Sequence, residues 1–258
     1  IQNKNFSWFS DFSLSHNREK IKELASGQLK DEANAWFVGE PFKVFYDYKK
    51  EGIWQLGEEA AAAANGQEPG DIKVQDVDGN GVITTDDRII YSQRPDVTFG
   101  FNNTFNYKGF DLSVFLYARL GQWIAYDYNT TYRINALENG GNVDYWTPEN
   151  PTNAFPRPNK SKSYTQVTYY STLKYEDGSF FKIRDITLGY TFKPELLKHL
   201  NLSRLRVYAT AKNFFTFSKI DNYDPEQGGS ISFPMTKQLV FLSLIHISEP
   251  TRRVVISY

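Results

Sequence analysis

"TFGFNNTFNYKGFDLSVFLYARL", residues 98–120, alternates apolar and polar side chains on either side of a short polar break. Most odd-numbered residues from Phe99 to Tyr107 are aromatic, and all even-numbered residues from Phe110 to Ala118 are apolar. A period of two is typical of a β-strand, because successive side chains point to opposite faces. The break, Lys108-Gly109, has the length and the glycine of a tight hairpin turn. The stretch therefore predicts a β-hairpin with two long strands.

Three further segments repeat this alternation, and each predicted strand has about ten residues, the length that a tilted strand needs to cross a lipid bilayer. Strands of soluble sandwiches usually have about five or six residues. Length and alternation together favour an all-β, transmembrane-barrel fold, with a soluble β-sandwich as the alternative. The three segments are NFSWFSDFSLS (5–15), FFKIRDITLGYTF (180–192) and LRVYATAKNFFTF (205–217).

Long polar connections separate the predicted strands, at residues 16–40, 52–95, 121–165 and 218–234. Loops of this length are uncommon in compact soluble domains, where most connections have about 4–6 residues. Short turns at 108–109 and near 193–203 alternate with them. Outer-membrane barrels have short turns on the periplasmic side and long loops on the extracellular side. We therefore expect the long connections to be extracellular loops.

The composition excludes some classes of function. With 29 basic and 30 acidic residues, the net charge is -1, so the chain lacks the basic surface that nucleic acid requires, and we expect no nucleic-acid partner. Cysteine is absent, which suits a protein of the cell envelope. No apolar window is long enough for a transmembrane helix. Because the chain begins at Ile1 without a secretion signal, we expect it to be a piece of a longer protein.

One loop has the spacing of a calcium site. Within DVDGNGVITTDD, residues 76–87, oxygen-bearing groups occupy the positions that an EF-hand loop uses, and a glycine stands at the sixth position. Calcium prefers several oxygen ligands around one point, which such a loop can supply. The candidate ligands are Asp76, Asp78, Asn80, Val82 through its backbone carbonyl, Thr84 and Asp87.

The surroundings of this loop differ from those of a calcium sensor. An EF-hand has a helix on each side, whereas GDIKVQ before the loop alternates like a strand and Pro95 follows soon after it. Asp87 stands where the bidentate Glu is usual, which weakens affinity. We therefore expect a lone loop that binds structural Ca²⁺ as a cofactor. The alternative is a loop rich in Asx turns that binds no metal.

The sequence offers no catalytic constellation, and we expect no enzymatic activity. Its three histidines lie outside known catalytic spacings, and no nucleophile elbow, zinc-binding helix motif or phosphate loop occurs. Paired acids could serve a glycosidase, but surface acids are far commoner. Trp54, Trp123 and Trp146 lie in the predicted long loops. If exposed, they could contact a substrate or partner by stacking on sugar rings; packing inside a loop core is the alternative.

Several stretches together resemble a known family. They are GDIKVQDVDGNGVITTDDRIIYSQRPDVTFGFNNTFNYKGFDLSVFL (70–116), YWTPENPTNAFPRP (145–158), EDGSFFKIRDITLGYTF (176–192) and LRVYATAKNFFTFSKIDNYDPE (205–226). In this order they resemble the C-terminal part of the SusC/RagA class of TonB-dependent outer-membrane transporters. The resemblance implies that residues 1–241 supply about seven or eight strands of a large antiparallel barrel of roughly 22 strands, plugged in its lumen.

The resemblance also implies a function. Transporters of this class import oligosaccharides or peptides through the outer membrane of Gram-negative bacteria, in contact with its lipid. A SusD-like surface lipoprotein closes their extracellular mouth, and TonB supplies energy through an N-terminal region that this chain does not include. From another class of function, a secreted, calcium-stabilised, β-rich glycan-binding module is the alternative.

The last residues depart from the family pattern. SFPMTKQLVF, residues 232–241, begins an alternating strand, but LSLIHISEPTRRVVISY, residues 242–258, does not continue it. Within it, SLIHISEPTRR resembles translated sequencing-adaptor read-through. We therefore predict that residues 242–258 form a non-native tail. The alternative is that VVISY, which ends on Tyr258, serves as an unusual last strand.

Overall fold

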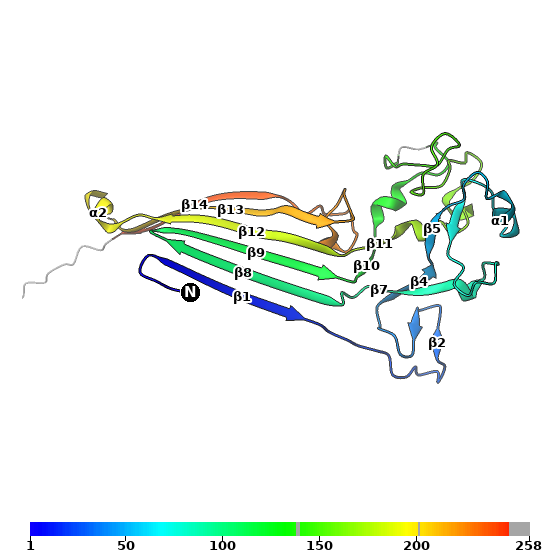
Figure 1. Ribbon diagram of the computed structural model, residues 1–258, viewed down its shortest axis with the longest axis horizontal. Helices are drawn as coiled ribbons and strands as arrows, with labels where there is room; N and C mark the ends of the chain where they lie inside the picture. The colour runs from blue at the N-terminus through cyan, green and yellow to red at the C-terminus, as the bar shows by residue number, and fades with distance from the viewer. Residues whose placement is uncertain (138–139, 201, 248–258) are drawn as a thin grey trace, which may run out of the picture.

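The computed structural model describes residues 1–137, 140–200 and 202–247 and is dominated by one antiparallel sheet of six strands, in the order β1-β8-β9-β12-β13-β14 (Figure 1). Neighbours in this sheet follow one another along the chain, apart from small elements in the loops. The all-β prediction is confirmed, but the sheet has six long strands rather than seven or eight. Their bounds are Phe6–Ser15, Val97–Tyr107, Phe110–Leu120, Phe180–Thr191, Leu202–Ser218 and Gln238–Ile247.

The predicted hairpin is confirmed as β8 and β9. Tyr107 pairs with Phe110 across a two-residue turn. Both turn residues have positive φ, 46° for Lys108 and 93° for Gly109, as in the turns whose twist matches that of the flanking strands. A side chain at Gly109 would place its Cβ 2.9 Å from the carbonyl oxygen of Thr191. Glycine is therefore required here for its conformation and for its small size.

One face of the sheet is apolar and is not covered by other parts of the described chain. In β9, Leu112 lies opposite Phe105 on one side and Leu188 on the other. The exposed fraction is 52% for Leu188, 60% for Phe12 in β1 and 72% for Phe241 in β14. Apolar side chains of a soluble sandwich are buried against a second layer. The exposure of this face contradicts the sandwich alternative.

The opposite face is polar and carries its own hydrogen bonds. The hydroxyls of Thr187 and Thr210 lie 2.9 Å apart across β12 and β13. The guanidinium of Arg206 donates two hydrogen bonds to the carboxylate of Asp111, at 2.9 and 2.5 Å. This pair spans β12 at Gly189, where a Cβ would lie 2.6 Å from the carboxylate oxygens. The sheet therefore has one apolar and one polar face, as the alternation predicts.

A β-bulge keeps the two faces separate along β12. Ile183 lies opposite Leu116 and Asp185 lies opposite Phe115, so Arg184 is an extra residue in the ladder. Ile183 and Asp185 would point to the same face of a regular strand. The bulge moves Asp185 to the polar face while Ile183 stays on the apolar face.

The predicted boundary of the non-native tail falls inside β14. This strand pairs with β13 up to Ile247, so residues 242–247 continue the sheet; residues 248–258 lie outside the described part of the chain. Leu242 lies opposite Tyr208 and Leu244 opposite Arg206, on the face that is polar in the neighbouring strands. Val240, opposite Thr210, is on this face too, so the alternation is already lost before residue 242. Whether the tail is native stays a prediction.

All long connections leave the sheet at one end, and the short ones leave at the other (Figure 1). The long connections contain four two-stranded sheets and short helices. The paired strands are β2 (Lys30–Asp31) with β3 (Trp36–Phe37), β4 (Val44–Tyr48) with β7 (Arg88–Ser92), β5 (Lys50–Ile53) with β6 (Ile72–Val74), and β10 (Trp123–Ala125) with β11 (Tyr175–Asp177).

The helices are short. None in the described part of the chain is long and apolar enough to cross a membrane. The α-helices are α1 (Glu59–Ala64) and α2 (Pro194–Leu197). The 3₁₀ helices are η1 (Thr85–Asp87), η2 (Asp127–Thr131), η3 (Tyr164–Gln166), η4 (Tyr170–Lys174), η5 (Lys198–Leu200) and η6 (Pro225–Gln227).

The main hydrophobic core lies in these loops and not in the sheet. Its buried residues come from β5, β6, η4 and the segment before Phe155, and they join the first long connection to the second; they are Ile53, Ile72, Val74, Trp146 and Leu173. We call this cluster the loop core. The long connections of this chain therefore form a folded layer with a hydrophobic interior.

We expect a charge on the apolar face to disrupt folding, and a charge on the polar face to be tolerated. In the full-length protein, Val114→Lys should destabilise the membrane-inserted form by roughly 2–4 kcal/mol, because lysine at mid-membrane depth is costly. Ser113→Lys, one residue away on the polar face, is the matched control. The measurement is the fraction of heat-modifiable, folded protein after refolding into lipid vesicles. Equal folding of the two variants would contradict a lipid-facing surface.

Candidate functional site

The calcium-like loop, residues 76–87, follows β6 and brings three of its predicted ligands together. We call it the acidic loop. One carboxylate oxygen from each of Asp76, Asp78 and Asp87 lies within 4.8 Å of the corresponding oxygens of the other two. A strand precedes the loop, and a single 3₁₀ turn leads from it into β7. The prediction of a lone loop without two flanking helices is confirmed. The geometry has the spacing that oxygen ligands need to share one cation.

Backbone hydrogen bonds hold two of these carboxylates. Asp87, whose side chain is buried, accepts from the N–H groups of Thr84 at 2.7 Å and Val77 at 2.8 Å. Asp76 accepts from the N–H groups of Gly79 and Gly81, at 2.8 and 2.7 Å. The bond from Thr84 is the main reason that the pKa of Asp87 lies below its ordinary value. The ionised Asp87 carboxylate therefore stabilises the fold above the ordinary pKa of aspartate, and this stabilisation is lost as the pH falls through the lowered pKa.

The other predicted ligands fold the loop locally. The side-chain oxygen of Asn80 accepts from the N–H of Val82 at 2.8 Å, and its amide donates to Asp78 at 2.8 Å. The Thr84 hydroxyl accepts from the N–H of Asp86 at 3.2 Å and caps η1. These bonds are the Asx turns of the alternative interpretation. In this structure the acidic cluster and the turn bonds coexist, since both use the same side chains.

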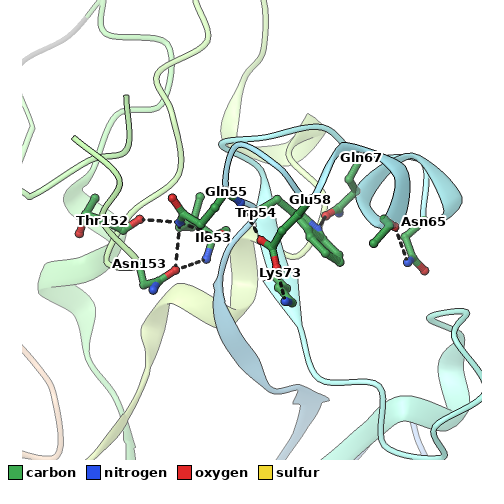
Figure 2. Close-up of polar contacts among 10 residues, drawn as sticks. Ile53, Trp54, Gln55, Glu58, Asn65, Gln67, Lys73, Thr152 and Asn153 are labelled. Carbon is green, nitrogen blue, oxygen red and sulfur yellow. Dashed lines mark hydrogen bonds and ion pairs between the residues drawn. The ribbon is translucent and has the colours of Figure 1, made fainter. Parts of the chain in front are cut away.

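The loop is attached to the loop core through Ile83. Its N–H donates to the side-chain oxygen of Asn65 at 3.0 Å, and its side chain packs against the loop core. Asn65 ends α1, where its amide donates to the carbonyl of Ala61, as Figure 2 shows. Ordering of the acidic loop is therefore coupled to packing of the first long connection.

Two of the three predicted tryptophans are not exposed. Trp54 is 7% and Trp146 is 4% exposed, so the expectation that they are open to a substrate is wrong. The indole N–H of Trp54 donates to Gln67 (Figure 2). That of Trp146 donates to Gln55, at the same distance of 2.8 Å. The alternative of packing inside a loop core describes both residues, because each buried indole has found a polar partner.

A polar network around Gln55 joins the two long connections (Figure 2). The Gln55 amide donates to the carbonyls of Ile53 and Thr152, and the side-chain oxygen of Asn153 accepts from the N–H of Ile53 at 3.0 Å. Sequence reasoning missed these residues. They are about 100 positions apart in the chain, and no local pattern marks them.

Trp123 is different, because it is half-buried at the wall of a cavity. The cavity has a volume of about 340 Å³ and is lined by the first two long connections and by Lys219 of the β13–β14 connection. The ring of Trp123, in β10, packs edge-on against Tyr91 in β7, with 4.7 Å between ring centroids. The polar wall includes Lys50, Asn129 and Glu176. None of these three was predicted, since each comes from a different element.

Burial shifts both charged groups of this cavity toward their neutral forms. Desolvation raises the pKa of the Glu176 carboxyl and lowers the pKa of the Lys50 ammonium. The amide of Asn129 donates to Glu176 Oε1 at 3.0 Å and to the carbonyl of Leu173 at 2.8 Å. Lys50 Nζ donates to the carbonyl of Ala154 at 2.5 Å. The cavity therefore presents an acid, an amide and an amine held in fixed positions.

Known proteins resemble this chain over most of its length. A TonB-dependent receptor of Formosa agariphila, P3, is 32% identical over 248 residues, which is 88% of this chain. The receptor SusC of Bacteroides thetaiotaomicron is 28% identical over 264 residues, or 94% of the chain. The chain is homologous to the TonB-dependent receptors. No family model matches the sequence. The predicted resemblance to the SusC type of these receptors is confirmed.

Solved structures show the same fold. A structure of the RagAB peptide transporter has a TM-score of 0.71 at 24% identity and covers 95% of this chain. The RagAB peptide importer in its open-open state has a TM-score of 0.69 at 25% identity, over 95% of the chain. The relatives are named as receptors and transporters, so the prediction of a non-enzymatic protein is confirmed.

The chain matches only a portion of each of these relatives. The chain spans about a quarter, 24%, of the length of the curated relatives P3 and SusC. It covers 28% of the RagAB chain that it matches. The described loops and sheet therefore correspond to one portion of such a receptor.

We expect Asp87→Asn to loosen the acidic loop without any metal present. The Asp87 carboxylate accepts hydrogen bonds from two backbone N–H groups. In asparagine one of the two oxygens is replaced by an NH₂ donor, so one of these N–H groups loses its acceptor. In calcium-free buffer, limited proteolysis within residues 76–87 of the full-length receptor should become several-fold faster. Asp86→Asn, which changes an exposed neighbouring acid, is the control. Equal cleavage of both variants would show that Asp87 does not hold the loop.

Proposed function

We propose that this chain is a portion of an outer-membrane importer that takes up oligosaccharides in a Gram-negative bacterium. In this proposal a SusD-like surface lipoprotein is its partner on the loop side, and TonB supplies energy through a region outside this chain. The observation that carries the proposal is the sheet itself. Its exposed apolar face and its hydrogen-bonded polar face have the alternation of a barrel wall between lipid and lumen.

Lipid imposes a further condition on this sheet. Unpaired backbone groups in hydrocarbon cost several kcal/mol each, so a sheet in a membrane must close on itself. In the described residues, β1 and β14 are the edge strands. We therefore propose that strands from the rest of the receptor pair with these edges. The shared fold with the RagAB structures, each of which is several times longer than the matched region, supports this arrangement.

Two other functions are weighed against this one. A secreted glycan-binding module is disfavoured, because a soluble protein rarely exposes so continuous an apolar surface. Peptide import is the second candidate, because the structural neighbours are named as peptide transporters. We retain oligosaccharide as the proposed substrate, as the resemblance to the SusC/RagA class implies.

We propose that the acidic loop binds structural Ca²⁺ through Asp76, Asp78 and Asp87. The support is the clustering of three carboxylates within 4.8 Å, and the carbonyl of Val82 and the side chains of Asn80 and Thr84 complete the proposed ligand set. Hard cations take six to eight oxygens, and a loop can supply them if it turns sharply at its glycines. The ion would neutralise the mutual repulsion of the acids and hold the loop against α1.

Growth experiments test the import proposal. Deleting the full-length gene should abolish growth on one oligosaccharide while leaving growth on its monosaccharide unchanged, because the smaller sugar passes through porins. Complementation with the intact gene is the control. Unchanged growth on every oligosaccharide, combined with lost uptake of peptides, would identify peptide as the substrate.

Calorimetry tests the calcium proposal. The purified full-length receptor should bind one Ca²⁺ that Asp78→Asn removes, with a Kd of roughly 0.1–1 mM, as in extracellular calcium modules. Asp86→Asn should leave the titration unchanged, because its carboxylate lies outside the cluster. If Asp78→Asn binds as much Ca²⁺ as the parent receptor, the loop is stabilised by its Asx turns alone.

A further inference from the structure

We propose that the cavity beside Trp123 is a subsite for one neutral sugar unit of the imported oligosaccharide. The inference rests on the proposed function for the source of its ligand, and it adds the place and the residues that bind it. The cavity lies between β5, β7, β10, β11, η2 and η4, within the folded layer at the long-loop end of the sheet. Its volume of about 340 Å³ is within the range of small-molecule sites.

The aromatic walls supply the first requirement of a sugar site. Trp123, Tyr91 and Tyr175 line the cavity, and they hold one another in place. Tyr91 packs edge-on against Trp123 and stacks on Tyr175 with 5.3 Å between centroids. The C–H face of a pyranose ring is apolar and flat, so it packs favourably on a rigid aromatic surface. Because these rings are already fixed by their neighbours, binding costs little side-chain entropy.

The polar wall supplies the second requirement. A sugar hydroxyl both donates and accepts, so its site needs donors and acceptors side by side. Lys50 has three N–H donors, of which one is given to Ala154. Among the described residues, no hydrogen bond engages Glu176 Oε2 or the side-chain oxygen of Asn129. An amine, a carboxylate and an amide oxygen are thus available around the same cavity.

The charges of the cavity favour a neutral ligand. The ionised forms of Lys50 and Glu176 carry opposite charges. Burial lowers the pKa of Lys50 and raises the pKa of Glu176, which favours the neutral form of each. A second pair, Lys219 with Asp177, closes another part of the wall at 3.0 Å. A ligand with net charge would meet one attractive and one repulsive group of each pair. Uncharged hydroxyls can bond to both members of a pair at once.

This cavity also explains why Trp123 differs from the other loop tryptophans. Trp146 belongs to the loop core, Trp54 is buried elsewhere in the loop layer, and both indoles donate to glutamines. Trp123 stands outside the loop core, at the junction of the two long connections. A ligand here would contact both connections, so binding would also stabilise their packing against each other.

The test uses the purified full-length receptor and four probes: maltopentaose, laminaripentaose, xylopentaose and mannopentaose. The growth assay first identifies which of the four is imported, and calorimetry then measures its binding. Trp123→Ala and Glu176→Gln should each weaken binding by about tenfold or more, because each removes a contact made only in the complex. Trp36→Ala and Glu68→Gln, in the same loop layer but outside the cavity, should change the Kd by less than about twofold.

A second variant guards against misfolding. Trp123→Phe keeps an aromatic ring in the wall, so the receptor should fold, but the change in tryptophan fluorescence on adding the sugar should be lost. If the imported sugar binds all cavity variants as tightly as the parent receptor, the subsite is wrong although the proposed function stands. If no sugar is imported and peptides are taken up instead, the proposed substrate and the subsite are both overturned.

Discussion

The register of the six-stranded sheet is the constraint on which the rest of the structure depends. Side chains directly opposite one another share a face, so a slip of one residue in any strand would exchange its apolar and polar faces. The pairs Leu112–Leu188 and Thr187–Thr210 show that the register is kept across three strands. At Arg184 the chain has one residue too many, and the bulge absorbs it. In the proposed barrel one face contacts hydrocarbon and the other faces the lumen, so an uncorrected slip would place charges in lipid at considerable cost.

The long loops depend on the sheet for position and on their own core for order. Strand ends deliver the first two long connections to the same end of the sheet, where Trp146 from one and Ile53 from the other pack together. Gln55 then bonds to both segments, which gives the buried indole of Trp146 its acceptor. Loops of polar composition can form such a layer because a few large apolar side chains supply the burial. The acidic loop joins this layer through Ile83, so its order and that of the loop core are linked.

Much of the fold could be predicted from the sequence, because its signals are local. Alternation in residues 98–120 predicts the hairpin and its faces, and the spacing of residues 76–87 predicts the gathering of three carboxylates. The sequence could not show that Trp54 and Trp146 are buried, since polar neighbours in the chain do not reveal partners from other loops. Nor could it indicate the cavity. Its wall joins Lys50 and Glu176, which are far apart in sequence and are brought together only when β5 and β11 have formed their separate small sheets.

A buried lysine joins the sheet to the connection between β13 and β14. Lys182 lies in β12 near the loop end of the sheet, has no exposed side-chain surface, and is 2.7 Å from both Asp224 and Glu226 in the β13–β14 connection. A buried ammonium without a partner is strongly destabilising, so the sheet requires this connection to be folded. The connection in turn requires the lysine, because two neighbouring carboxylates repel each other unless a cation lies between them. Arg184, the residue that the bulge expels from the ladder, adds a second cation to Glu226 at 3.1 Å. The irregularity that preserves the two faces of the sheet therefore also strengthens its junction with the loops.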